Sequence, residues 1–274
     1  MIKIAICAPG KRLEREHADA VQDRFAGRDD VELVFHRQCF ERHGHFAGDD
    51  ATRLAALLEC ANDDSVDAVW FAAGGYGSNR IAADALAGMG DAARGKTWLG
   101  YSDTGYLLAA LYRTRTGVPV HGPMVADIGR PNGEHAIDRA VGFLCGDTAG
   151  VEAEIDDRAT AAFNLTTLAM LCGTDLMPDL SGHVVLIEEV SEHLYAIDRL
   201  LFHVSHHLRG IAGLRLGRIS DIPENDRPFG QSEEEIVRYW CAREDIPYLG
   251  FADIGHDAAN KIVPFGLAAA ASRA

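Results

Sequence analysis

Short apolar runs alternate with helical patterns through the first half of the chain, and this alternation restricts the possible folds more than any other feature. Strands are predicted at residues 2–7, 31–36, 68–72, 97–101 and 118–121. Helices are predicted between them, near residues 14–25, 50–62, 79–88 and 104–114. This order predicts a parallel sheet covered by helices on both faces. Ligands of such sheets bind beyond the carboxyl ends of the strands, so we expect a site at that edge.

The alternation is interrupted near the middle of the chain by a turn signal, a helical pattern near residues 134–144 and an acidic stretch. We predict an N-terminal α/β domain at residues 1–125, a linker region at 126–160 and a C-terminal domain at 161–274. The elements expected in the C-terminal part are a helix near 164–172, a strand at 183–189 and a helix near 193–209. A further helix is expected to begin after Ser232, because Ser-Glu-Glu-Glu fits a capping box.

Charge and composition exclude several classes of partner. The net charge of −15 disfavours a nucleic acid or an acidic membrane surface as the partner. The first residues are predicted to form a strand rather than a secretion signal, and no apolar run is long enough to cross a bilayer. We therefore expect a cytoplasmic protein. Its six cysteines are scattered without a CxxC pair, which predicts reduced, buried thiols rather than a disulfide framework or a zinc site.

A glycine-rich segment follows the strand predicted at residues 68–72 and precedes a helix. It reads Gly74-Gly75-Tyr76-Gly77-Ser78-Asn79-Arg80. Glycines permit a sharp turn there, and Ser78 would lie at a helix N-terminus, where free N–H groups could stabilise an oxyanion. This is the logic of a nucleophile elbow. An anion-binding loop, in which the serine only hydrogen-bonds a phosphate, fits the same spacing equally well.

A serine nucleophile needs a base and an orienting carboxylate. Glu188 and Glu189 end an apolar strand, and only one of them can face a given site because adjacent strand residues point in opposite directions. His256 lies in a glycine-flanked turn between two apolar runs. Taken alone, each has an ordinary structural explanation. The histidines at 203, 206 and 207 lie along the polar side of a helix without a partner motif, so we predict no metal site.

Together, these segments resemble the LD-carboxypeptidase family of serine peptidases, which includes muramoyl-tetrapeptide carboxypeptidases and microcin C immunity peptidases. Their shared order and spacing make the resemblance specific across most of the chain. The matching pieces are Gly74–Arg80, Gly100-Tyr101-Ser102-Asp103, His121-Gly122-Pro123-Met124, Asn164-Leu165, Glu188-Glu189-Val190 with Tyr195 and Ile197-Asp198-Arg199, and Gly255-His256 with Asn260.

The resemblance implies a Rossmann-like N-terminal domain, a β-rich C-terminal domain and a site between them. It implies Ser78 as nucleophile, Glu188 as the acid and His256 as the base. In the corresponding mechanism, the backbone N–H groups of Gly75 and Asn79 would bind the oxyanion. Candidate substrate contacts are Tyr76, Arg80, Ser102 and Asp103.

The implied activity is hydrolysis of a terminal L–D peptide bond in a cell-wall tetrapeptide, with release of D-alanine through an acyl-enzyme. The resemblance also implies a homodimer that needs no cofactor. Two alternatives stay open. One is a peptidase or amidase acting on a peptide–nucleotide antibiotic, with Tyr76 or Phe163 stacking on the base. The other is a non-catalytic α/β module that binds a phosphate ligand on the glycine-rich loop.

Overall fold

A computed structural model describes residues 1–267 of the chain. Six strands form the first sheet, in the order β10-β5-β4-β3-β1-β2, and all pairs are parallel except β10 with β5. The strands are β1 (Ile2–Cys7), β2 (Val31–Phe35), β3 (Ala68–Phe71), β4 (Thr97–Gly100), β5 (Val118–His121) and β10 (Val263–Pro264). The prediction of a parallel sheet at the N-terminal end is therefore confirmed.

Helices cover both faces of this sheet, because its strands are apolar on both sides. Val69 and Phe71 of β3 join the cluster formed with α2 (Asp50–Asn62), α3 (Ser78–Gly88) and α4 (Gly105–Thr114). Trp70 points to the opposite face, as strand alternation requires, and joins the cluster formed with α1 (Arg15–Phe25) and α5 (Gly133–Leu144). Four short 3₁₀ helices lie in the connections of this part of the chain: η1 (Arg37–Phe40), η2 (Asp91–Gly95), η3 (Ser102–Thr104) and η4 (Val125–Gly129).

Residues 126–160, predicted as a linker region, contain most of η4 and all of α5. The α5 side chains of Ile137, Ala140 and Val141 are buried in the same cluster as β1. An amphipathic helix that buries an apolar stripe belongs to the layer it covers. This part of the chain therefore packs with the first sheet rather than connecting two units loosely.

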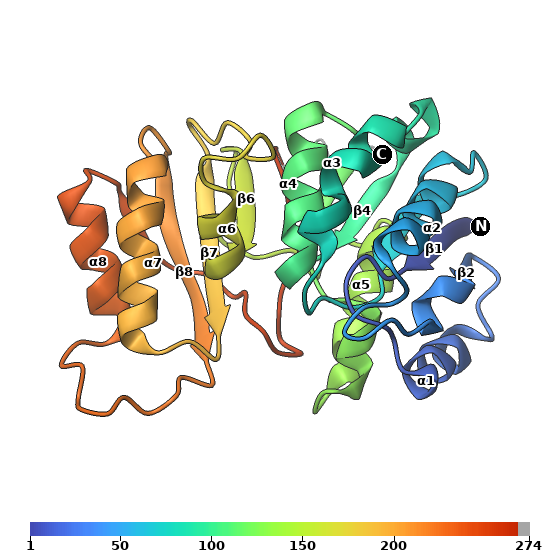
Figure 1. Cartoon of the computed structure of the whole chain (residues 1–274), viewed down its shortest axis with the longest axis horizontal. Helices are drawn as coiled ribbons and strands as arrows, with labels where there is room; N and C mark the ends of the chain where they lie inside the picture. Colours follow the sequence, from blue (N-terminus) through green and yellow to red (C-terminus); the bar gives the residue numbers. More distant parts are fainter. Residues whose placement is uncertain (268–274) are drawn as a thin grey trace.

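The second sheet is also parallel, with four strands in the order β6-β7-β8-β9. Its strands are β6 (Thr160–Asn164), β7 (Val184–Val190), β8 (Gly213–Ser220) and β9 (Tyr248–Phe251). The helices α6 (Leu165–Leu171), α7 (Leu194–His207) and α8 (Glu233–Arg243) pack on one face. The α8 helix begins with the expected capping box between Ser232 and Glu235. Figure 1 shows this unit beside the first sheet, with α6 near α4.

The chain crosses back between the two sheets after β9. Residues 252–262 leave the second sheet, and β10 then pairs with β5 of the first sheet. On the way, the N–H of Glu152 donates to the carbonyl of Ile262, and Thr160 exchanges hydrogen bonds with Gly266. This returning segment carries His256, so the fold places a residue from the C-terminal part over the carboxyl edge of the N-terminal sheet. Within residues 1–267, no helix is both long enough and apolar enough to cross a membrane.

Candidate active site

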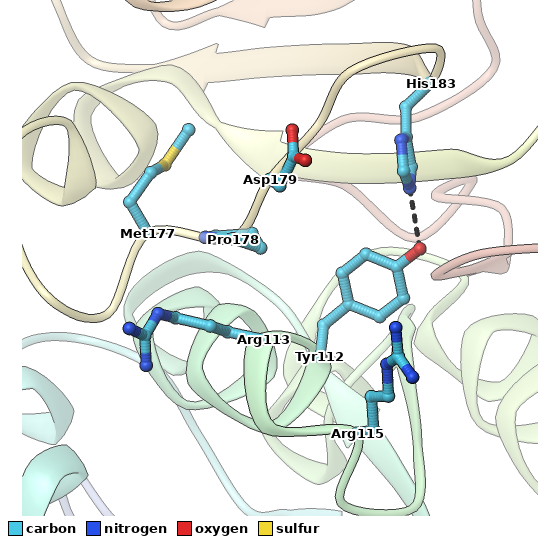
Figure 2. Close-up of a pocket in the computed structure, with 7 residues that line it drawn as sticks. All are labelled: Tyr112, Arg113, Arg115, Met177, Pro178, Asp179 and His183. Carbon is cyan, nitrogen blue, oxygen red and sulfur yellow. Dashed lines mark hydrogen bonds between the residues drawn. The ribbon is translucent and has the colours of Figure 1, made fainter.

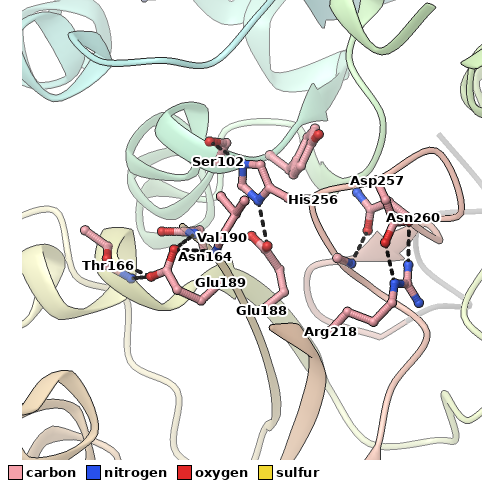
Figure 3. A network of polar contacts seen from close by, with 12 residues as sticks. Ser102, Asn164, Thr166, Glu188, Glu189, Val190, Arg218, His256, Asp257 and Asn260 are labelled. Carbon is pink, nitrogen blue, oxygen red and sulfur yellow. Dashed lines mark hydrogen bonds and ion pairs between the residues drawn. The ribbon is translucent and has the colours of Figure 1, made fainter. Parts of the chain in front are cut away.

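A hydrogen-bonded chain of three side chains crosses the seam between the two sheets (Figure 3). The imidazole of His256 contacts Glu188 through Nδ1, with 2.6 Å between Nδ1 and Oε2. Its other nitrogen, Nε2, lies 3.0 Å from Oγ of Ser102. Glu188 is fully buried on β7, and Ser102 follows β4. A carboxylate, an imidazole and a hydroxyl in this order have the geometry of a catalytic triad.

The hydroxyl beside His256 therefore belongs to Ser102, which was expected to be a substrate contact. Ser102 is the first residue of η3, at a sharp turn directly after β4, and has a φ of 60°. This left-handed conformation costs free energy for a residue with a Cβ and is found at strained functional positions. A strand, a strained serine and a helix together form the turn called a nucleophile elbow. The turn is tight because Gly100 lacks a Cβ, which would collide with Thr104 and Phe71.

The expected pairing of Ser78 with His256 is corrected by these contacts. Ser78 is the first residue of α3, as predicted, but its side chain is completely buried. Its Oγ donates a hydrogen bond of 2.5 Å to the backbone carbonyl of Asp103, so the hydroxyl points into the protein. The serine after the glycine-rich loop supports the elbow instead of reaching the imidazole.

Asp103 connects the glycine-rich loop to the elbow. Its carboxylate accepts hydrogen bonds from the backbone N–H groups of Gly77 and Ser78, at 3.1 and 2.9 Å. Burial raises the pKa of the Asp103 carboxyl, against the lowering effect of these two hydrogen bonds. The residue was a predicted substrate contact, but its carboxylate is occupied by the loop. It acts as a clamp that fixes the two segments relative to each other.

Glu188 and Glu189 point to opposite sides of β7, as the strand pattern predicted. Glu188 faces His256, whereas Glu189 accepts hydrogen bonds from Asn164 Nδ2 at 2.6 Å and from Thr166 N at 2.7 Å. Figure 3 shows both carboxylates on the same strand. Glu189 thus satisfies a free backbone N–H at the start of α6, while Glu188 is the carboxylate that faces His256.

The loop of His256 is held by Asn260, whose Oδ1 accepts a hydrogen bond of 3.1 Å from Gly255 N. Nε2 of His121 lies 3.2 Å from the same oxygen. Burial lowers the pKa of His121 to about 4, so this imidazole is neutral near pH 7 and Nε2–H donates to Asn260. The loop is thus supported by this neutral contact on one side and by the ion pair of Asp257 with Arg218 on the other.

The pKa values of the ionisable pair are both shifted upward. Burial raises the pKa of the Glu188 carboxyl above its usual value. For His256, burial acts to lower the pKa, but the charge of Glu188 and the hydrogen bond to it prevail and raise it. The partner carboxylate thus favours the imidazolium that forms when His256 accepts a proton.

A cavity of about 370 Å³ opens onto this serine and histidine. Its lining residues are Lys11, His17, Gly74, Gly75, Tyr101, Ser102, Met124, Ala126, Asp127, Gly129, Arg130 and His256. Gly75 lies on the wall of the cavity, and its N–H forms no backbone hydrogen bond within the described part of the chain. Asn79, the other expected oxyanion donor, does not line the cavity. The N–H of Asp103, the residue that follows Ser102 in η3, also forms no backbone hydrogen bond within the described part of the chain.

The remaining predicted substrate contacts lie outside the cavity. The guanidinium of Arg80 pairs with Asp50 at 2.7 Å and does not reach the wall of the cavity. Tyr76 is 48% exposed and packs beside Phe46. Phe163 is buried and packs edge-to-face on Phe265, so it cannot stack on a ligand.

A second cavity, of about 690 Å³, lies on another part of the seam (Figure 2). It is lined by Tyr112, Arg113, Arg115, Met177, Pro178, Asp179 and His183. There, the Tyr112 hydroxyl contacts Nε2 of His183 at 2.6 Å and connects α4 with the segment before β7. Figure 2 shows the two arginines pointing away from each other, so they do not converge on one ligand position. Within residues 1–267, no group of three or more histidine, cysteine or acidic side chains is arranged to hold a metal.

The chain matches two family descriptions in sequence. Residues 4–122 match the LD-carboxypeptidase N-terminal domain, and residues 160–270 match the LD-carboxypeptidase C-terminal domain. The "Probable murein peptide carboxypeptidase" of Bacillus subtilis is 30% identical over 247 residues, covering 85% of this chain and 77% of that protein. The "Murein tetrapeptide carboxypeptidase" of Pseudomonas aeruginosa is 25% identical over 284 residues, covering 96% and 91%.

Solved structures show the same fold. The muramoyltetrapeptide carboxypeptidase from Oxalobacter formigenes superposes with a TM-score of 0.81 at 26% identity, covering 96% of this chain and 92% of that one. MccF in complex with glutamyl sulfamoyl guanosine gives a TM-score of 0.77 at 16% identity, covering 97% and 91%. The likeness to MccF is a likeness of fold alone. The predicted fold class, an N-terminal α/β parallel-sheet domain followed by a second domain, is therefore confirmed.

Proposed function

Because the chain belongs to the LD-carboxypeptidase family, we propose that it is a serine carboxypeptidase that releases D-alanine from cell-wall tetrapeptides. The bond attacked would be the terminal L–D bond, such as the one between diaminopimelate and D-alanine. The observation that carries the proposal is the chain of contacts from Glu188 through His256 to Ser102. The names of the bacterial relatives support the class of substrate.

Ser102 is the nucleophile in this proposal. Its Oγ attacks the scissile carbonyl carbon while Nε2 of His256 takes the hydroxyl proton. The imidazolium then gives this proton to the leaving amine, so D-alanine departs and an acyl-enzyme remains. Water attacks the ester with His256 again as base, which releases the shortened peptide and restores the hydroxyl. Glu188 keeps the proton of neutral His256 on Nδ1 and stabilises the imidazolium.

The oxyanion is assigned to backbone donors on the two segments that Asp103 clamps together. The N–H of Gly75 comes from the glycine-rich loop, and the N–H of Asp103 comes from the elbow itself. Donors fixed before the reaction need no reorganisation when charge develops, and this is the source of their effect. The glycine-rich loop therefore contributes an oxyanion donor in the proposed mechanism, although its serine, Ser78, takes no part in the reaction.

Tetrapeptides with a terminal L–D, D–D or L–L bond provide the direct test of the reaction. We expect mass spectrometry to detect loss of alanine from the L–D peptide and little loss from the other two. Only the configuration of the residues flanking the bond differs between the peptides, so each serves as a control for the others. Equal cleavage of all three, or cleavage of none, would contradict the proposed specificity.

A fluorophosphonate probe tests the chemical class separately from the substrate. Such probes phosphonylate an activated serine, so we expect a single adduct on Ser102 in the peptide map. Labelling carried out at low pH, where His256 is protonated, should be slower. Binding without a covalent adduct would support the phosphate-binding alternative, and an adduct on Ser78 would overturn the assignment of the nucleophile.

The peptide–nucleotide alternative rests on one feature, the exposed ring of Tyr76 beside Phe46 near the glycine-rich loop. An exposed aromatic ring can stack on a base. Including an aminoacyl sulfamoyl nucleoside among the substrates decides between the two candidates, since faster cleavage of that compound than of the L–D tetrapeptide would favour the alternative.

We also propose that the protein works in the cytoplasm as a homodimer. Large apolar side chains are exposed on the outer helices of the second sheet, at Met170 of α6, at Tyr195 and Phe202 of α7, and at Tyr239 of α8. Exposed apolar groups on neighbouring helices favour self-association. Light scattering coupled to size-exclusion chromatography should give twice the mass of the 29.6 kDa chain.

A further inference from the structure

We propose that Arg130 binds the terminal carboxylate of the peptide and thereby makes the enzyme a carboxypeptidase. This inference rests on the proposed function, because it takes Ser102 as the nucleophile and His256 as the donor to the leaving amine. A carboxypeptidase must recognise one free carboxylate next to the scissile bond. A guanidinium fits that task because its planar fork matches a carboxylate in two parallel hydrogen bonds.

Arg130 is held in a fixed position at the cavity wall. It follows η4, and its Nε donates a hydrogen bond of 2.7 Å to Oδ1 of Asp127. The Tyr101 hydroxyl also donates to Oδ1 of Asp127, at 2.9 Å, and the N–H of Met124 donates to Oδ2 at 2.8 Å. Tyr101 is buried, so this anchor is rigid. A preorganised guanidinium loses less conformational entropy on binding than a free surface arginine.

The anchor leaves part of the guanidinium available. The contacts of Arg130 within residues 1–267 use Nε and, at 3.5 Å, one terminal nitrogen; the other terminal nitrogen has no partner there. The side chain is 39% exposed and lines the same cavity as Ser102. Asp127 meanwhile accepts hydrogen bonds from three different groups, which spreads its charge. The outer edge of the guanidinium can therefore receive a second carboxylate.

Arg130 also lies on the side where the leaving residue must be. His256 protonates the leaving amine, so the terminal residue extends from the scissile bond toward the imidazole. Tyr101 contacts both groups: its ring centroid is 4.8 Å from that of His256, and its hydroxyl reaches Arg130. A terminal residue spans only about 3.8 Å of backbone. Its carboxylate must therefore be bound close to His256, as the position of Arg130 permits.

The other cations near the cavity fit this role less well. Lys11 lines the cavity beside Gly75, where a Cβ on Gly75 would touch its side chain, and this is the oxyanion side of the proposed site. Arg80, a candidate substrate contact from the sequence, is paired with Asp50 outside the cavity. Among these cations, Arg130 is thus the one that is rigidly anchored, has an unoccupied guanidinium edge and lies near His256.

The test compares an L–D tetrapeptide ending in a free D-alanine carboxylate with the same peptide ending in a D-alanine amide. We expect the wild-type protein to prefer the acid. Arg130→Gln should raise KM for the acid roughly 10- to 100-fold, as expected for the loss of hydrogen bonds between charged groups, and leave the amide almost unchanged. Arg130→Lys should recover part of the loss. Arg94→Gln, which removes an exposed arginine paired with Asp91, is the matched control.

A binding measurement separates this inference from the reaction. Ser102→Ala and the double variant Ser102→Ala/Arg130→Gln are titrated with both peptides by calorimetry. The inference predicts that the second change weakens binding of the acid alone, by roughly 10- to 100-fold. Equal weakening of acid and amide, or no weakening, would overturn it. Wild-type protein that neither cleaves the acid nor reacts with the fluorophosphonate would instead refute the proposed function, whatever the binding data show.

Discussion

Ser102→Ala is expected to lower kcat for the L–D tetrapeptide by at least about 10³-fold, while the protein stays folded. Loss of a triad nucleophile leaves only the contribution of the oxyanion donors and of binding. Replacing the hydroxyl by hydrogen opens no large cavity, and alanine tolerates the left-handed φ of 60° about as poorly as serine. Circular dichroism and thermal unfolding should therefore match those of the wild type.

Ser78→Ala is the matched comparison, since it removes the same group at the position favoured by the sequence. The variant loses a buried hydrogen bond to the Asp103 carbonyl, which should cost about 1 kcal/mol of stability. Its kcat should remain within about tenfold of the wild type, because the elbow loses one support and no reacting atom. The reverse result, with Ser78→Ala inactive and Ser102→Ala active, would contradict the assignment.

Glu188→Gln is expected to reduce kcat by roughly 10³- to 10⁴-fold. Glutamine has nearly the shape of glutamate, but its amide nitrogen can present a donor to Nδ1 and favour the wrong tautomer of His256. The variant also lacks the charge that stabilises the imidazolium. Glu189→Gln is the control on the neighbouring residue: it should destabilise the start of α6 and affect turnover much less. Comparable losses in both variants would argue against a specific role for Glu188.

Glu188→Gln is also expected to change the dependence of activity on pH. His256 must be neutral to act as a base, so activity falls as the pH drops through its pKa. Glu188 raises this pKa by its charge and its hydrogen bond, although burial opposes the effect. Removing the charge should therefore move the acidic limb of the kcat/KM profile to lower pH in Glu188→Gln. An unchanged limb would show that another group controls it.

Most of the framework could be predicted from the sequence because it depends on local patterns. The five parallel strands of the first sheet and the helices between them begin and end within one or two residues of their predicted bounds. The strands β6 and β8 were missed, and β9 and β10 were recognised only as apolar runs. A buried strand of a parallel sheet lacks polar alternation, so its pattern is less distinctive than that of an amphipathic helix.

The identity of the hydroxyl could not be settled by local patterns alone. Ser78 and Ser102 both follow a buried strand and precede a helical segment, and both lie in segments that resemble the family. Only the contact with His256, 154 positions farther along the chain than Ser102, distinguishes them. One local signal pointed to Ser102: Gly100-Tyr101-Ser102 places a glycine two residues before the serine, as in the G-x-S part of a nucleophile elbow.

Strand geometry predicted that only one of the two adjacent carboxylates faces the site, and the resemblance to the family indicated Glu188. The opposite orientation of the two glutamates was predicted correctly. The sequence contained no sign, however, that Glu189 binds groups at the start of α6. Similarly, Arg130 lies in the stretch predicted as a linker region, where a charged residue is ordinary and does not indicate a binding site. Its importance becomes visible only when η4 is folded against Tyr101.

Because the chain returns from β9 to β10, the site forms only when both sheets and the segment between these strands are in place. Ser102 follows a strand of the first sheet, and Glu188 lies on a strand of the second. His256 lies in the returning segment that ends in β10, which pairs with β5. Neither half of the chain contains a complete set of reacting groups. A newly made N-terminal half would therefore carry an inert serine until the last strand docks, and hydrolytic activity would appear only when folding is complete.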